Sequence, residues 1–339
     1  MNRATTFPFL NAAALKQPSA AHLLVPVLMI IALALVGNFS TWVTLTLAGL
    51  AMGMMIFIMA SGLTLVFGLM DVLNFGHGAF ISLGAFIGVT VMAALSPWMQ
   101  AASFGANLAA IGAGALVAMV AAGLFGWVFE RVIVMPVYGN HLKQILITMG
   151  GLIVVEQLIY VFWGPDAIPI PRPDTLKGAF ALGDVVLEKY RVLAVVLGLG
   201  IFFAMRLTLK RTKIGLLVRA GVENSEMVEA LGYRIGVLFV AVFVVGSALA
   251  GLGGVMWGLY QEVITAHMGM EVMILVFIVV IIGGLGSVEG CFLGALLVGL
   301  MNNYTAYLAP KVALGSSILL MVAVLMWRPE GLMPMAKGR

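Results

Sequence analysis

Apolar runs of about 20 residues follow one another along almost the whole chain, and this repetition constrains the fold more than any other feature. A helix needs about 20 mostly apolar residues to cross the hydrocarbon core of a bilayer. The candidate spans are residues 22–38, 42–70, 76–95, 107–129, 144–163, 190–208, 236–259, 271–286, 290–308 and 312–327. The sequence therefore predicts an all-α polytopic membrane protein with about eight to ten transmembrane helices in a single domain, residues 1–339.

The charge content supports this prediction. Only 9% of the residues are charged, and the mean hydropathy is +1.14, whereas a soluble domain carries about 25% charged residues. The net charge of +4 does not indicate nucleic-acid binding, because Lys and Arg in a membrane protein mark the cytoplasmic side.

The positions of Lys and Arg predict the orientation. With the N-terminus inside, 13 of the 18 basic residues fall on cytoplasmic segments, so we expect both termini to be cytoplasmic. Residues 1–21 then form a cytoplasmic segment, and the first apolar run is a retained span because no small-residue cleavage site follows it. Residues 164–189 form the largest extracytoplasmic loop, in which four prolines exclude a regular helix. This loop is either a connector or a docking surface for an external partner.

The longest cytoplasmic loop, residues 206–235, contains the pattern of a short amphipathic helix. Asn224 or Ser225 can cap its start, and Gly232 is placed to end it. The acidic residues Glu226 and Glu229 lie near its positive N-terminal end, and Met227, Ala230 and Leu231 share one face. It is either an ordinary loop helix or a helix that fits a groove on another protein.

Motifs for catalysis and cofactor binding are absent from the sequence. It contains no P-loop, no H-E-x-x-H and no G-x-S-x-G, and its four His residues are scattered, so we expect no cofactor, no metal and no enzymatic activity. Cys291, the single cysteine, is expected to be a small packing residue. Glu156 is the one acid placed well inside a predicted span, either as a snorkelling or helix-paired acid or as a pathway-lining acid.

A polar cluster interrupts the second and third apolar runs at "GLMDVLNFGHGAF", residues 68–80. Asp71, Asn74 and His77 are spaced by three, and Gly76 and Gly78 predict a break in the helix. The break is either a short cytoplasmic turn or irregular backbone that lines an aqueous cavity, and we favour gate or pathway support. Gly84, four residues before Gly88, predicts a close-packing helix face after the break.

A second glycine-rich break lies at "GGLGSVEGCFLGALLVG", residues 283–299. Its helix-breaking and packing residues are Gly283, Gly284, Gly286, Gly290 and Gly294. Both breaks continue with G-[AC]-F, at residues 78–80 and 290–292, which suggests an internal repeat of the kind found in many transporters.

Five blocks in order resemble the membrane permeases of branched-chain amino acid ABC importers, over residues 50–333. They are "GLTLVFGLMDVLNFGHGAFISLGAF", "TMGGLIVVEQLIYVFWGPD", "VRAGVENSEMVEALGYRIGVLFVAVFVVGSALAGLGGV", "IIGGLGSVEGCFLGALLVGL" and "WRPEGL". The resemblance implies a multi-pass protein of the bacterial inner membrane that forms half of a translocation pathway. Its implied partners are a second homologous permease, two cytoplasmic ATP-binding subunits and a periplasmic solute-binding protein. Residues 225–231 would be the coupling helix, with Glu229, Ala230 and Gly232 matching the family's E-A-…-G element.

The chain departs from the family pattern at two places. Glu156 and Gln157 stand where neutral residues are expected, and the last block continues "GLMPM". Similar permeases carry urea, amides, aromatic acids and sugars, so the solute stays open among these and amino acids. An ion-coupled secondary transporter, with Glu156 or Asp71 as the coupling acid, is the alternative of another class.

Overall fold

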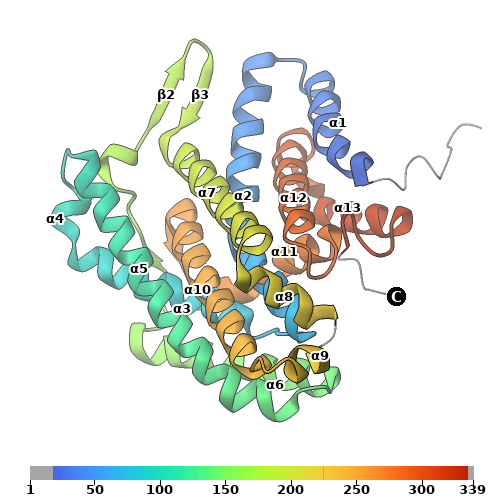
Figure 1. The fold of residues 1–339 in the computed structure, drawn as a ribbon. Helices are drawn as coiled ribbons and strands as arrows, with labels where there is room; N and C mark the ends of the chain where they lie inside the picture. The colour runs from blue at the N-terminus through green and yellow to red at the C-terminus, as the bar shows by residue number, and fades with distance from the viewer. Residues whose placement is uncertain (1–17, 224, 335–339) are drawn as a thin grey trace, which may run out of the picture.

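The computed structural model describes residues 18–223 and 225–334, and each of the ten predicted spans is a helix (Figure 1). The ten helices are α1 (Pro18–Val36), α2 (Phe39–Met70), α3 (His77–Ala94), α5 (Phe104–Phe129), α6 (His141–Trp163), α7 (Lys189–Arg211), α10 (Ile235–Gln261), α11 (Met268–Gly283), α12 (Val288–Leu308) and α13 (Ala313–Trp327). Within the described residues seven helices are long and apolar enough to cross a membrane, and three shorter ones are equally apolar. The chain is therefore an all-α polytopic membrane protein, as predicted.

Short elements connect these helices. They are α4 (Ser96–Met99), η2 (Glu130–Val134), η3 (Met135–Val137), β1 (Ile168–Pro169), η4 (Asp174–Leu176), β2 (Ala179–Leu182), β3 (Val185–Glu188), α8 (Lys213–Glu223), α9 (Ser225–Ala230), β4 (Val263–Ile264) and η5 (Pro310–Val312). The end of the bundle that carries α8 and α9 is called the inner end, and the end that carries the β2–β3 hairpin the outer end (Figure 1). Whether the termini face the cytoplasm stays a prediction. Residues 1–17 of the predicted N-terminal segment lie outside the described residues, and residues 18–21 belong to α1.

Helix α2 is the centre of the bundle, and glycines let its neighbours approach its backbone. A Cβ on Gly53 would lie 2.7 Å from the carbonyl oxygen of Ala295 on α12, and Gly62 touches the backbone of Gly246 on α10. Small residues at helix contacts increase van der Waals packing where no hydrophobic effect drives association. Close helix contacts at glycines therefore hold the core of the bundle together.

The outer segment, residues 164–189, contains no α-helix before α7 begins at Lys189, which agrees with its prolines. It forms the antiparallel β2–β3 hairpin, which projects from the bundle (Figure 1). Its first strand, β1, pairs antiparallel with β4 at the end of α10, with Ile168 opposite Ile264. The segment is thus attached to the helices by backbone hydrogen bonds, a feature that the sequence did not reveal.

The inner loop, residues 206–235, holds two helices where the sequence predicted one. Helix α9 begins at Ser225 as expected, and Asn224, the other proposed cap, lies outside the described residues. Gly232 ends it with φ 89°, and the Gly232 and Tyr233 amides donate to the carbonyls of Glu229 and Val228. This pair of hydrogen bonds forms a Schellman motif. Helix α8 was not predicted.

The break after α2 is re-entrant. Asp71 has φ 51°, and after it the chain turns back along α2 until α3 begins at His77. The ring of His77 bonds the carbonyl of Met59, eleven residues before the last residue of α2, Met70. At 1.5 Å per residue, α3 therefore begins about 16 Å inside the inner end of α2.

A second re-entrant break, at residues 262–267, mirrors the first from the outer end. Helix α10 is followed by Glu262 with φ 58°, and Ile264 turns back beside Gly258. Helix α11 then begins beside α3, where Gly269 and Gly78 are in backbone contact. The G-[AC]-F similarity at residues 290–292 is not the structural counterpart of residues 78–80, since Gly290 follows only a short turn between α11 and α12.

Candidate functional site

Asp71 lies at the inner surface, apart from the other two polar residues of its cluster. Its carboxylate oxygen Oδ2 is 3.7 Å from Nε2 of His141, at the start of α6, and both side chains are more than half exposed. Tyr138 lies nearby against Phe239. Burial raises the pKa of Tyr138 above its usual value, and the negative charge of Asp71 raises it further.

Asn74 and His77 are buried within the bundle. Nε2 of His77 lies 2.9 Å from the Met59 carbonyl, which only accepts, so Nε2 carries the proton and Nδ1 is an acceptor. Among the described residues, neither Nδ1 nor either polar atom of the Asn74 side chain has a hydrogen-bond partner. Buried polar groups without partners are costly. This part of the break is therefore not a solvent-exposed polar turn.

The segment that carries Asn74 runs between α6 and α11. The Phe75 amide donates to Oγ1 of Thr148 on α6 at 3.1 Å, and the Phe75 ring lies 4.5 Å from that of Phe277 on α11. Gly76 has no room for a side chain, because a Cβ there would overlap the ring of Phe129. The break is thus held by two helices, and glycine is required within it.

Glu156, on α6, contacts a histidine that precedes α11. Its Oε1 lies 2.7 Å from Nδ1 of His267, and the ring of Tyr160 meets His267 edge-on. The side chain of Glu156 is only 8% exposed, whereas that of His267 is 57% exposed. Glu156 lies fifteen residues beyond His141 on α6, about 22 Å along the helix axis, so it does not join the Asp71 site.

Apart from Gly76, which faces the ring of Phe129, the predicted helix-break and packing glycines lie at close backbone contacts. Gly84 touches Gly251 on α10, Gly283 touches Gly290, and Gly294 faces the Val279 carbonyl. Gly284 and Gly286 have φ values of 100° and 82° in the turn between α11 and α12, and a Cβ on Gly68 of α2 would lie 2.8 Å from Gly286. These residues position the helices.

Helix α9 presents its predicted apolar face to solvent. Met227 is 61% and Leu231 71% exposed, and Ala230 and Glu229 are also exposed. The side chain of Glu226 lies outside the described residues. Val228, which the sequence reading did not single out, is buried and anchors the helix.

An ion-pair cluster at the outer end was missed by sequence reasoning. The guanidinium of Arg172 lies 3.2 Å from carboxylates of both Glu188 and Glu262, and it donates to the carbonyls of Leu259 and Tyr260 at the end of α10. Its side chain is only 13% exposed. An arginine inside the proline-rich segment was the one available signal.

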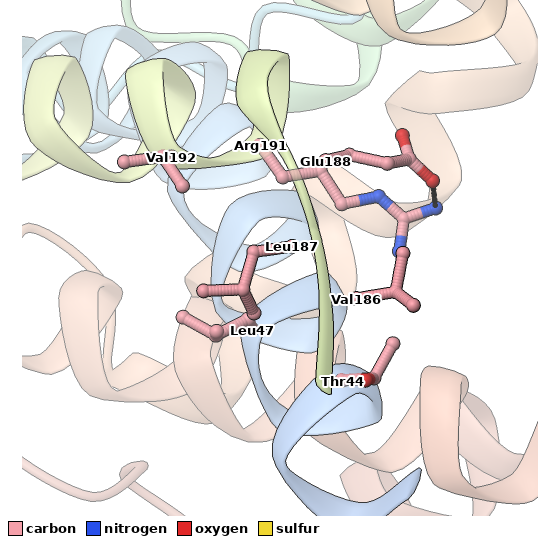
Figure 2. A pocket seen from close by; sticks show the side chains of 7 residues that line it. All are labelled: Thr44, Leu47, Val186, Leu187, Glu188, Arg191 and Val192. Carbon is pink, nitrogen blue, oxygen red and sulfur yellow. Dashed lines mark ion pairs between the residues drawn. The ribbon is translucent and has the colours of Figure 1, made fainter. Parts of the chain in front are cut away.

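Glu188 also pairs with Arg191, at 2.8 Å. Figure 2 shows these two side chains at the edge of a small hollow between α2, β3 and α7, which is otherwise mostly apolar. In the part of the chain that the structure describes, no group of three His, Cys, Asp or Glu residues is arranged to hold a metal ion.

Comparison with known proteins gives one consistent family. The family described as "Branched-chain amino acid transport system / permease component" matches residues 45–326. The chain is 29% identical to the high-affinity branched-chain amino acid transport system permease protein BraD of Pseudomonas aeruginosa over 303 residues, 84% of this chain and 93% of that protein. It is 28% identical to LivH of Escherichia coli K12 over 291 residues, with the same coverage, and 26% identical to LivM of that strain over 312 residues, covering 69% of LivM. No solved structure matches the chain.

Proposed function

Because this chain belongs to the branched-chain amino acid transport permease family, we propose that it forms half of the translocation pathway of an ABC importer for branched-chain or related amino acids. The family and the apolar helices make the chain a multi-pass membrane permease. The proposal adds the bacterial inner membrane and three kinds of partner. These are a second permease, two ATP-binding subunits and a periplasmic solute-binding protein that delivers the solute.

The exposed helix α9 carries the proposal. Leu231 is 71% exposed and Met227 is 61% exposed, although a helix of six residues is far too short to be stable without tertiary contacts. Val228 attaches the helix to the bundle, so the exposed face is held at a fixed position. An apolar helix face presented in this way suits a groove on a cytoplasmic ATPase. Glu226, Glu229, Ala230 and Gly232 complete the proposed coupling element.

A mechanical route leads from α9 to the polar break. Helix α8 precedes α9, and a Cβ on its Gly221 would lie 3.2 Å from the side chain of Leu69, in the last turn of α2. Asp71 follows two residues later and begins the re-entrant segment. A displacement of α9 by the ATPase therefore reaches the segment that carries Asn74 and His77, which we assign to gate support.

The outer segment supplies a surface for the binding protein. Phe180 and Val186 of the β2–β3 hairpin are each about half exposed, and the hairpin projects beyond the helices (Figure 1). Arg172 fixes the base of this segment to the end of α10. We assign residues 164–189 to docking of the periplasmic partner.

Two substitutions test the coupling assignment. Glu229→Lys reverses a charge on the exposed face of α9, and Gly232→Val places a branched side chain at φ 89°. Both variants should insert into the membrane but lose ATP-dependent uptake and co-purification of the ATPase. Gly236→Val is the matched control, because Gly236 also has open space around its Cα but has no positive φ. Uptake at the wild-type rate in both test variants would contradict the coupling role.

Gentle extraction of the tagged chain from its native membrane tests the importer itself. Recovery of a second permease and ATPases would identify the complex. Titration of the binding protein with amino acids, urea, amides and aromatic acids would then identify the solute. Recovery of the chain alone, active in liposomes without ATP, would replace the importer by an ion-coupled transporter. Glu156 and Asp71 would then be the acids to substitute first.

A further inference from the structure

One exposed face of α11 carries a histidine and a glutamate beside two apolar side chains. His267 precedes the helix, and Met270, Glu271 and Ile274 follow it at offsets of three, four and seven residues. These offsets place all four residues on one side of a helix. The His267 side chain is 57% exposed, Met270 is 48% and Ile274 59% exposed, and Glu271 is exposed as well.

This face, although exposed at the side of the bundle, lies far from both membrane surfaces. Glu271 precedes Gly283, the last residue of α11, by twelve residues, which is about 18 Å of helix. At that inner end of α11, Gly283 packs on Gly290, and the adjacent Glu289 pairs with Lys210 and Arg206. The hydrocarbon core of a bilayer is about 30 Å thick, so Glu271 lies near its middle.

The face of α5 at the same depth has a different composition. Two contacts with α10 relate the depths of α5 and α3. Gly126 of α5 packs on Ser247, and Gly84 of α3, which runs parallel to α10, packs on Gly251, four residues further along α10. Gly126 is therefore about four residues nearer the start of α3 than Gly84 is. Residues near 124–126 therefore lie level with the start of α3. The exposed side chains along this α5 face, namely Leu116, Val117, Val120, Leu124, Trp127 and Val128, are all uncharged and apolar.

A carboxylate at this depth cannot face lipid without a large cost, since inserting an acid at the centre of a membrane helix costs about 3 kcal/mol or more. Among the described residues Glu271 has no ion-pair partner, and it stands one turn from the partly exposed His267. An aqueous space removes this cost. The uniform α5 face needs no such space.

We propose that the α11 face formed by His267, Met270, Glu271 and Ile274 lines a water-filled translocation pathway that a second permease subunit closes from the opposite side. The re-entrant segment extends this face toward the inner end, because Phe75 packs on Phe277 of α11 and Asp71 is exposed beyond it. The proposal rests on the importer function argued above, and it names the surface that the pathway uses.

Cysteine labelling in the assembled complex tests this assignment. Cys291, the only native cysteine, is buried, so single cysteines can be added to the native background. Glu271→Cys and Ile274→Cys are the test variants, and Leu124→Cys on α5 is the control at similar depth, with exposure of 62% against 59% for Ile274. A membrane-impermeant charged maleimide should label both test variants at least about tenfold faster than the control, because the reactive thiolate forms only where water enters.

Ile274→Cys keeps the test valid should Glu271→Cys fail to assemble. Labelling of neither variant above the Leu124→Cys rate, in complexes that still transport, would overturn the pathway assignment and leave the importer intact. Labelling of both variants in a chain that never supports ATP-dependent uptake would instead contradict the importer and retain an aqueous face.

Discussion

The two re-entrant segments, residues 71–76 and 262–267, have the same design and opposite directions. Each follows a long helix whose next residue is an acid with positive φ, Asp71 or Glu262, and these are the only two such non-glycine residues in the described chain. A valine follows each acid, and a histidine stands at the start of each following helix, His77 as the first residue of α3 and His267 directly before α11. The two segments enter from opposite ends, and the helices that follow them meet at Gly78 and Gly269.

The difference lies in how firmly each segment is held. Arg172 binds two carboxylates and two carbonyls around residues 259–262, and β1 pairs with β4. The inner segment is held by the exposed contact of Asp71 with His141, the Thr148 bond to Phe75 and the packing of Phe75 on Phe277. The buried side chains of Asn74 and His77 keep polar atoms without partners among the described residues. The two segments are therefore similar in backbone path but differ in how firmly contacts hold them. The less firmly held segment, residues 71–76, is the one next to α8 and α9.

The glycine contact at the centre should give the largest effect. A Cβ at Gly269 would overlap the backbone of Gly78, and a Cβ at Gly78 would lie 2.8 Å from the Gly269 carbonyl oxygen. Overpacking against backbone costs about 1–3 kcal/mol. We expect Gly78→Ala and Gly269→Ala both to lower the thermal unfolding midpoint in detergent, and Gly269→Ala to lower it more, because its Cβ would overlap the Gly78 carbonyl and also approach Oγ of Ser82.

Gly200→Ala on α7 is the control, because nothing lies within 4 Å of a Cβ there. It should match or exceed the stability of the wild type, since alanine favours helix over glycine. A large loss for one of the two central glycines and none for the other would break the comparison between the segments.

Removing Arg172 should have the next largest effect, confined to the outer segment. Arg172→Ala leaves Glu262 and two carbonyls without their donor, and hydrogen bonds to charged groups contribute about 1.5–3 kcal/mol. Amide hydrogen exchange should rise at residues 168–169 and 263–264 and stay unchanged at residues 72–76. Lys177→Ala, which removes an exposed pair with Asp174 in the same segment, should change neither. Equal exchange changes in both segments would show that Arg172 restrains the whole centre.

Asn74 offers a smaller stability effect with a functional readout. Its side chain is buried without partners among the described residues, so Asn74→Leu should leave the free energy of unfolding unchanged or raise it by up to about 1 kcal/mol, while uptake falls. Asn107 is the matched control, because it is equally buried but bonds Trp98, Ala101 and Thr175. Asn107→Leu should destabilise the protein. Wild-type uptake by Asn74→Leu would reduce the inner segment to a packing element.

Sequence reasoning predicted the helices and the first break because both depend on local signals. Ten apolar runs became ten helices, and Gly76 and Gly78 marked the break at residues 71–77. The second break was missed because residues 262–267 contain no glycine or proline, and the turn depends on Glu262 adopting positive φ under the restraint of Arg172. Arg172, the partner of that glutamate, lies ninety residues earlier in the chain, and a local sequence pattern cannot predict a contact across that separation.

The candidate site was likewise predictable only where it depends on local signals. The α9 start and its Gly232 ending were predictable from capping rules, whereas the burial of Val228 depends on its neighbours in the fold. The spacing of Asp71, Asn74 and His77 suggested one cluster. The chain instead exposes the first and buries the other two, because the non-helical backbone of residues 71–76 turns from the inner surface into the bundle between them.

Asp71→Asn should give the smallest change in stability, and a set of substitutions at Asp71 separates two roles. Asparagine adopts positive φ at least as readily as aspartate, so Asp71→Asn keeps the helix end and removes the charge, and an exposed pair of this kind contributes at most about 1 kcal/mol. Asp71→Gly also keeps the turn, whereas Asp71→Ala strains it by about 1–2 kcal/mol. If Asp71 acts as a conformational cap, uptake and unfolding midpoint stay near wild type in the Asn and Gly variants and fall only in the Ala variant. If uptake falls equally in the Asn and Ala variants, the charge toward His141 is what the inner segment needs, and its weak restraint is electrostatic.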